Sequence, residues 1–177
     1  FPGQFEDFEE IPVHRPNVHE GFGRVDVAYA LQPEHRRRES FDNAAGIGHQ
    51  EAFDLSFRVR NSDEPVRVTL VYHDFPGSLA TSRVLVNDLD VSVENAVGEV
   101  FYPNRLSQAD RVNNVEHIDI ENPQPGTYRL RVFAHAVRIG NSEEKQPFAL
   151  VVSGDIEFES ERFAQEENLS SQMPREY

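Results

Sequence analysis

The chain has 177 residues, of which 31 are acidic and 17 basic, so its formal net charge at pH 7 is −14. This charge argues against nucleic acid as a partner, because nucleic-acid binding needs a basic surface. The sequence contains no cysteine, which excludes disulfide bonds, thiol catalysis and cysteine-ligated zinc. No apolar run approaches the ~20 residues of a membrane-spanning helix, so the sequence predicts no membrane span.

The chain opens with a coil that leads into a short helix within residues 21–31. Val25, Ala28 and Tyr29 keep the i, i+3, i+4 spacing that places side chains on one helical face. Pro33 stands where such a helix would end. A helix this short needs a partner for its apolar face, and one hypothesis is self-association of the chain through that face.

Residues 32–50 are polar and then rich in Gly and Ala, without a period, which predicts a linker. From residue 51 to residue 154 apolar and polar side chains alternate in short runs, which is typical of half-buried strands. We therefore predict an all-β domain over residues 51–154, an antiparallel β-sandwich of the jelly-roll type with seven or eight strands. Residues 155–177 are acidic, lack a firm period and are predicted to form a tail.

Two groups of oxygen donors lie within this domain. Asp88 and Asp90 project from the same face of a strand, roughly 6.5–7 Å apart, and repel each other unless solvent or a cation separates them. The second group follows some twenty residues later, at the start of another strand. Oxygen donors suit Ca²⁺, which takes 6–8 oxygen ligands at about 2.3–2.6 Å. The predicted calcium ligands are Asp88, Asp90, Asp110, Asn113, Asn114 and Glu116. The alternative is a solvated polar edge whose Asn and Asp residues form turns.

Several segments of the sequence resemble parts of one family of enzymes. Residues 21–31 (GFGRVDVAYAL) resemble the closing helix of the catalytic domain in subtilisin-like serine peptidases. Residues 68–78 (VTLVYHDFPGS), 85–90 (LVNDLD), 113–116 (NNVE) and 125–128 (PGTY) follow the order found in the C-terminal jelly-roll domain of certain alkaline secreted subtilases. That domain is similar in fold to the P domain of proprotein convertases.

The resemblance implies an accessory, calcium-binding β-domain that stabilises the catalytic domain of the same secreted polypeptide, an endopeptidase acting on protein substrates. Residues 1–31 would then be the end of the catalytic domain. The sequence has no Gly-Thr-Ser turn for the nucleophile, and none of its seven histidines has a matched Ser and Asp. We therefore predict no catalytic residue in this chain, no organic cofactor, and no hydrolysis of peptides by the chain alone.

A different hypothesis is a binding module for carbohydrate or a cell surface, which requires a row of exposed aromatic rings on one sheet. Most aromatic residues of the predicted strands have inward parity and are expected in the core: Phe53, Phe57, Tyr72, Tyr128 and Phe148. Phe133 has outward parity. Asp74 either helps a calcium loop or caps a turn, and we favour the turn.

Overall fold

The structure is a computed structural model that describes residues 37–77 and 84–158, together with residues 16, 17, 19, 21–25 and 27. The chain divides into two compact units, Phe1–Gln32 and Pro33–Tyr177. In the first unit, Asn17 and Gly21 form an antiparallel bridge, with N–H to O distances of 3.1 and 2.8 Å. Residues 21–25 of the helix predicted within residues 21–31 are not helical, and residues 26 and 28–31 lie outside the described residues, as does the predicted tail beyond residue 158.

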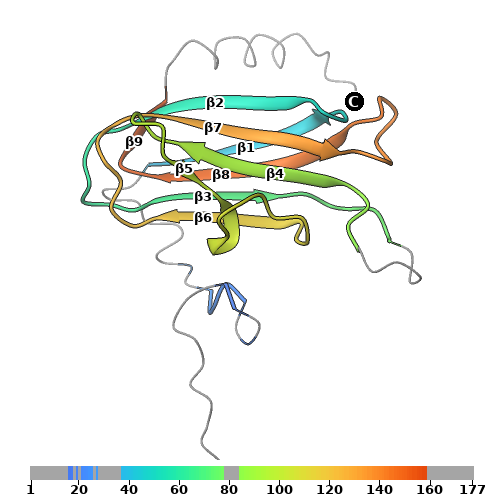
Figure 1. The fold of residues 1–177 in the computed structure, drawn as a ribbon, viewed down its shortest axis with the longest axis horizontal. Helices are drawn as coiled ribbons and strands as arrows, with labels where there is room; N and C mark the ends of the chain where they lie inside the picture. Colours follow the sequence, from blue (N-terminus) through green and yellow to red (C-terminus); the bar gives the residue numbers. More distant parts are fainter. Residues whose placement is uncertain are drawn as a thin grey trace, which may run out of the picture. The chain divides into compact units, whose positions relative to one another are not determined.

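The described part of the second unit consists of two antiparallel sheets, which Figure 1 shows as two layers lying face to face. The first sheet has the order β1 (Arg37–Ile47), β8 (Gln146–Gly154), β3 (Val66–Val71) and β6 (Val115–Ile120). The second has the order β5 (Val100–Phe101), β4 (Asp88–Glu94), β7 (Gly126–Ala136), β2 (Ala52–Val59) and β9 (Ile156–Phe158). A single 3₁₀ turn, η1 (Pro103–Arg105), leads from β5 towards β6. The predicted all-β sandwich is confirmed.

The alternation of apolar and polar side chains explains why these segments form sheets around one core. Inward side chains of both sheets are buried, and full burial of each large one stabilises the fold by about 1.5–3 kcal/mol. The aromatic rings with inward parity pack there, as expected: the rings of Phe57 and Tyr128 are stacked with centroids 5.6 Å apart. The core includes Leu55, Phe57, Val59, Val66, Val68, Leu70, Tyr72, Leu89, Val91, Val93, Ile118, Tyr128, Leu130, Val132, Phe148, Leu150 and Val152.

The predicted linker over residues 32–50 is wrong for residues 37–47, because these form β1. β1 lies at the edge of its sheet and pairs only with β8, and its register is interrupted between Asn43 and Ile47. Its half-buried side chains at alternate positions, Glu39, Phe41 and Asn43, include only one apolar residue, which hides the strand period in the sequence. Charged residues on an edge strand also protect it from pairing with another chain.

The predicted domain end at residue 154 is also too early, since β9 adds residues 156–158 to the second sheet. This strand is too short to show a period of its own. Its position follows from pairing with β2, where Phe57 lies opposite Phe158. Within the described residues, no helix has the length and apolar character needed to cross a membrane.

Candidate functional site

The two groups of oxygen donors meet at the open edge of β4. The outer neighbour of β4, strand β5, has only two residues and pairs with Val93 and Glu94. The residues of β4 before Val93 have no β5 partner on this edge, so their backbone N–H groups need other acceptors, because a buried N–H without a hydrogen bond destabilises the fold. The acceptors come from side chains of the opposite sheet.

Glu116 of β6 supplies one of these acceptors, and Tyr72, just after β3, supplies the other. The Glu116 Oε2 accepts the N–H of Val91 at 2.6 Å. The Tyr72 hydroxyl donates to the carbonyl oxygen of Asn87 at 3.1 Å and accepts the N–H of Leu89 at 3.5 Å. These two polar side chains therefore take the place of the missing part of β5.

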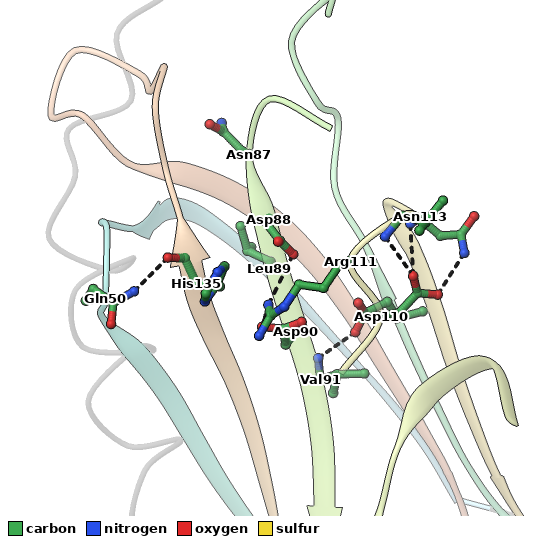
Figure 2. A network of polar contacts seen from close by, with 12 residues as sticks. Gln50, Asn87, Asp88, Leu89, Asp90, Val91, Asp110, Arg111, Asn113 and His135 are labelled. Atoms are coloured by element: carbon green, nitrogen blue, oxygen red, sulfur yellow. Dashed lines mark hydrogen bonds and ion pairs between the residues drawn. The ribbon is translucent and has the colours of Figure 1, made fainter. Parts of the chain in front are cut away.

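Asp88 and Asp90 are buried, at 2% and 7% exposure, on the face of β4 opposite Leu89. Arg111, in the loop before β6, lies over them (Figure 2). Its Nη1 lies 3.4 Å from the Asp88 Oδ1 and donates a hydrogen bond to the Asp90 Oδ2. The cation that two neighbouring carboxylates require is thus provided by the chain itself.

Asp110 organises the loop that carries Arg111. Its Oδ1 accepts the N–H groups of Val112 and Asn113 at 2.9 and 3.1 Å, and its Oδ2 accepts the side-chain amides of Asn104 and Asn113 at 2.6 and 2.7 Å. Burial by itself would raise the pKa of Asp110, but these hydrogen bonds outweigh it and lower the pKa. Both carboxylate oxygens are therefore engaged by N–H donors.

The other predicted ligands of the loop also have structural partners. Asn114 donates from its side-chain amide to the carbonyl oxygen of Tyr72 at 3.0 Å, and its own carbonyl oxygen accepts the Tyr72 N–H at 3.2 Å. Asn113 holds Asp110, as described above. The structure thus brings Asp88, Asp90 and Glu116 together at the edge of β4, whereas Asp110, Asn113 and Asn114 hold the loop beside it.

Asn104, in η1, covers the outer edge of β6. Its side-chain amide donates to the carbonyl oxygen of Val115 at 3.0 Å and its Oδ1 accepts the N–H of His117 at 3.1 Å. These are the bonds that a further strand would make. Its backbone is left-handed, with φ of 54°, a conformation that asparagine tolerates better than most residues.

Replacing Asn104 by alanine is expected to lower the free energy of unfolding by about 1–3 kcal/mol, because partly buried groups of β6 and the Asp110 carboxylate lose their partners. Urea unfolding followed by circular dichroism measures this loss. Asn104→Gly separates the side chain from the backbone, since glycine also accepts the left-handed conformation. A glycine variant as stable as the wild type would mean that the side-chain bonds contribute nothing.

Glu116 is a fully buried acid surrounded by other acids. Burial raises its pKa to about 9, against the opposing effect of the Val91 N–H, and the negative charges of Asp90, Asp110 and Asp88 raise it further. At neutral pH its carboxyl group therefore carries a proton in the ion-free protein.

Two buried oxygen atoms in this cluster lack hydrogen-bond partners among the described residues: the Asp90 Oδ1 and the Glu116 Oε1. Burial raises the pKa of Asp90 too, while the hydrogen bond and the charge of Arg111 oppose the rise. Because nearly all buried polar atoms in folded proteins have a partner, this pair is the feature of the site that most needs an explanation.

The donor atoms are of the type that calcium binds, but the described residues do not arrange them as a metal site. In the described portion of the chain, no three His, Cys, Asp or Glu side chains are arranged to hold one metal ion as they stand. Arg111 lies beside Asp88 and Asp90, and N–H donors engage Asp110. The oxygens that remain for an ion are the two unpartnered ones of Asp90 and Glu116, with Asp88 beside them, and they are of the type that calcium binds.

A second polar cluster fixes the start of β4. Asn87 is completely buried; its Oδ1 accepts the N–H groups of Arg138 and Ile139 at 2.8 and 3.2 Å. Its amide nitrogen donates to the Ile139 carbonyl oxygen and to the Gln146 Oε1, both at 2.6 Å. Asn87 thereby ties the connection between β7 and β8 to β4.

Asp74 has the turn-capping role that the sequence favours. Its Oδ1 accepts the N–H groups of Phe75 and Asn87, and its Oδ2 accepts that of Val86, all at 2.9 Å. A carboxylate with three backbone donors is a structural cap.

The functional residues that sequence reasoning missed are Arg111, Tyr72 and Asn104. The sequence signal for Arg111 was its position between two predicted ligands, Asp110 and Asn113, but a search for oxygen donors does not consider a basic residue.

No protein-family model and no curated protein matches the sequence. Among solved structures, the chain aligns with the crystal structure of a protein from Sulfurospirillum deleyianum at a TM-score of 0.32 and 9% sequence identity. The match covers 70% of this chain and 98% of that one. This likeness is too distant to carry an argument about function.

Proposed function

We propose that this chain is the accessory β-domain of a secreted subtilisin-like serine endopeptidase, a jelly roll that stabilises the catalytic domain of the same polypeptide. The strand order supports the jelly roll: β1-β8-β3-β6 faces β5-β4-β7-β2, the order produced when an eight-stranded antiparallel chain folds as two Greek keys. Residues 85–90 lead into β4 and residues 113–116 lead into β6, so two of the family-like segments meet at the candidate site.

The role of the domain would be structural, with peptide hydrolysis performed by the catalytic domain. The parentage has a direct test in the gene. The coding sequence upstream of Phe1 is expected to encode a Gly-Thr-Ser turn a few dozen residues before Gly21. An upstream sequence that encodes an unrelated domain would refute the proposed parentage.

The proposed function includes calcium binding by Asp88, Asp90 and Glu116. The observation that carries this proposal is the pair of buried, unpartnered oxygens, the Asp90 Oδ1 and the Glu116 Oε1. An ion bound there would give these two oxygens the partner that they lack among the described residues. Because it binds only the folded state, it would stabilise the domain by RT ln(1 + [L]/Kd).

Calcium is expected to raise the melting temperature of the EGTA-treated chain. At 100 times Kd the stabilisation is about 2.7 kcal/mol, which corresponds to about 5–10 °C for a protein of this size. Differential scanning calorimetry with calcium, with magnesium and with EGTA measures the shift. Asp90→Asn is expected to lose the calcium response, whereas Asp42→Asn, on the exposed face of β1, is expected to keep it. A midpoint that calcium leaves unchanged would contradict the proposal.

The alternative of a carbohydrate-binding module has less support. It requires exposed aromatic rings on a sheet, and none of the Phe or Tyr side chains in the described strands is exposed. Phe133, the ring with outward parity, is half-buried.

A further inference from the structure

β1 is the longest of the strands at the edges of the two sheets, and its outer side pairs with no other strand of the described residues. The edge strands β5 and β9 have only two and three residues. The edge of β6 is covered by Asn104, which bonds to the backbone of Val115 and His117. β1 has eleven residues and pairs with β8 in a regular register over residues 37–43. Every second residue of this segment therefore directs its backbone N–H and C=O groups away from β8.

The charges along this edge are self-complementary. Arg38, Ser40 and Asp42 alternate on the exposed face of β1. When a second copy of β1 lies antiparallel to the first with Ser40 opposite Ser40, Arg38 of each copy lies opposite Asp42 of the other. Opposite charges at such cross-strand positions stabilise the pairing of two strands. The other charged residues of the segment, Arg37 and Glu39, form an ion pair within their own strand at 2.7 Å.

The same side chains disfavour the neighbouring registers. Moving the two-fold axis from Ser40 to Glu39 places the two Glu39 side chains opposite each other, and like charges directly opposite destabilise a strand pair. Moving the axis to Phe41 places Asp42 opposite Ser40 and leaves the charges unmatched. Charged residues on an edge strand deter pairing with unrelated strands, but here they favour one register of the strand with itself.

We propose that the outer edge of β1 is a docking site for a second copy of this chain, which adds its own β1 in antiparallel order about a two-fold axis at Ser40. The two four-stranded sheets then join into one continuous sheet, and the outward backbone groups of each β1 bond to the other. Only the short segment 37–43 of each chain forms the contact, so the association is weak and populated at high protein concentration. It is independent of the proposed calcium binding and of the peptidase parentage.

The test is sedimentation velocity of the 177-residue chain in EGTA over a wide range of protein concentration. The wild type is expected to pass from monomer towards dimer as the concentration rises. Arg38→Asp and Asp42→Arg each place like charges opposite each other, so each variant alone is expected to dimerise at least about tenfold more weakly. A mixture of the two variants is expected to regain the association of the wild type, because a strand with two acidic side chains on this face then meets a strand with two basic ones.

Arg129→Asp is the matched control, because it makes the same change in net charge as Arg38→Asp on β7, which lies inside the second sheet. This variant is expected to associate like the wild type. A wild type that stays monomeric up to about 1 mM refutes the pairing. A dimer that neither β1 variant weakens forms through another surface, which also refutes it. If both variants are weakened and their mixture does not recover, the register at Ser40 is wrong and the proposal is overturned.

Amide hydrogen exchange of the wild type tests the same edge without a variant. The outward N–H groups within residues 37–43 are expected to exchange more slowly as the protein concentration rises, because pairing gives them hydrogen-bond acceptors. Exchange that does not depend on concentration overturns the proposal. Slow exchange at every concentration would mean that another segment of the same chain covers the edge, and fast exchange would mean that nothing does.

Discussion

Replacing Asn87 by alanine is expected to lower the free energy of unfolding by about 3–5 kcal/mol, a large part of the 5–15 kcal/mol of a typical domain. The side chain is completely buried and makes hydrogen bonds through both its oxygen and its nitrogen. Alanine leaves the N–H groups of Arg138 and Ile139 and the Gln146 Oε1 without this partner. The cost is high because Asn87 and Gln146 are both buried, so water cannot easily replace the bond that the Gln146 Oε1 loses.

Asn141→Ala is the matched control for this prediction. The Oδ1 of Asn141 accepts the N–H groups of Glu143 and Lys145 at 2.9 and 3.1 Å, and its amide donates to Ala45 at 3.2 Å, all at an exposed position. Solvent can replace these bonds, so we expect a loss of at most about 1 kcal/mol. Denaturation by urea measures both variants. Equal losses would show that the burial of Asn87 does not matter.

The period of two in the sequence was sufficient to predict the sandwich and its core. Residues 53–59 and 66–72 alternate cleanly, and the inward set of each, including Phe57 and Val68, is buried as expected, apart from the half-buried Phe53. The parity of β4 was also correct, because Leu89 and Val91 fall in the core. Such strands pack one face against apolar neighbours, so the local sequence already contains the constraint that decides which side is buried.

The features that escaped prediction depend on partners distant in the chain. β1 is held by pairing with β8, more than a hundred residues later, so its own sequence shows little of the constraint. Tyr72 looks like an ordinary strand residue in the sequence. Glu116 was predicted only as a calcium ligand, because the shortness of β5, which leaves the Val91 N–H for its carboxyl group to accept, is not visible in the local sequence. The pairing of Arg111 with Asp88 and Asp90 likewise depends on how the loop before β6 folds. The sequence could indicate that the two carboxylates need a cation, but not that the chain provides one.

The stability of the ion-free protein is expected to fall as the pH rises from about 5 to 9, and Glu116 is the cause. Its pKa is about 9 in the folded state and near its usual value of 4.5 in the unfolded chain. Between these values the folded state binds more protons, so the stabilisation is complete below the lower pKa and is lost as the pH rises through the upper one. The slope is at most about 1.4 kcal/mol per pH unit. The lowered pKa values of Asp110 and His117 act in the opposite direction, that of Asp110 only at acid pH below this window and that of His117 just below its usual value of 6.5.

Glu116→Gln is expected to flatten this profile and to be more stable than the wild type at pH 9 by about 2 kcal/mol or more. Glutamine is neutral at every pH, and its side-chain oxygen can still accept the N–H of Val91, so this backbone group at the edge of β4 keeps its hydrogen bond. Urea unfolding in EGTA at each pH unit measures the slopes, with Glu94→Gln, exposed on the same strand, as the control for losing one carboxylate. Parallel slopes for the wild type and Glu116→Gln would show that Glu116 does not titrate in this range.

In calcium the slope of the wild-type stability against pH should weaken or reverse, because the ion displaces the proton and the affinity for calcium rises with pH. In the ion-free protein the proton on Glu116 and the guanidinium of Arg111 on Asp88 and Asp90 thus act together to neutralise the buried acids of this cluster.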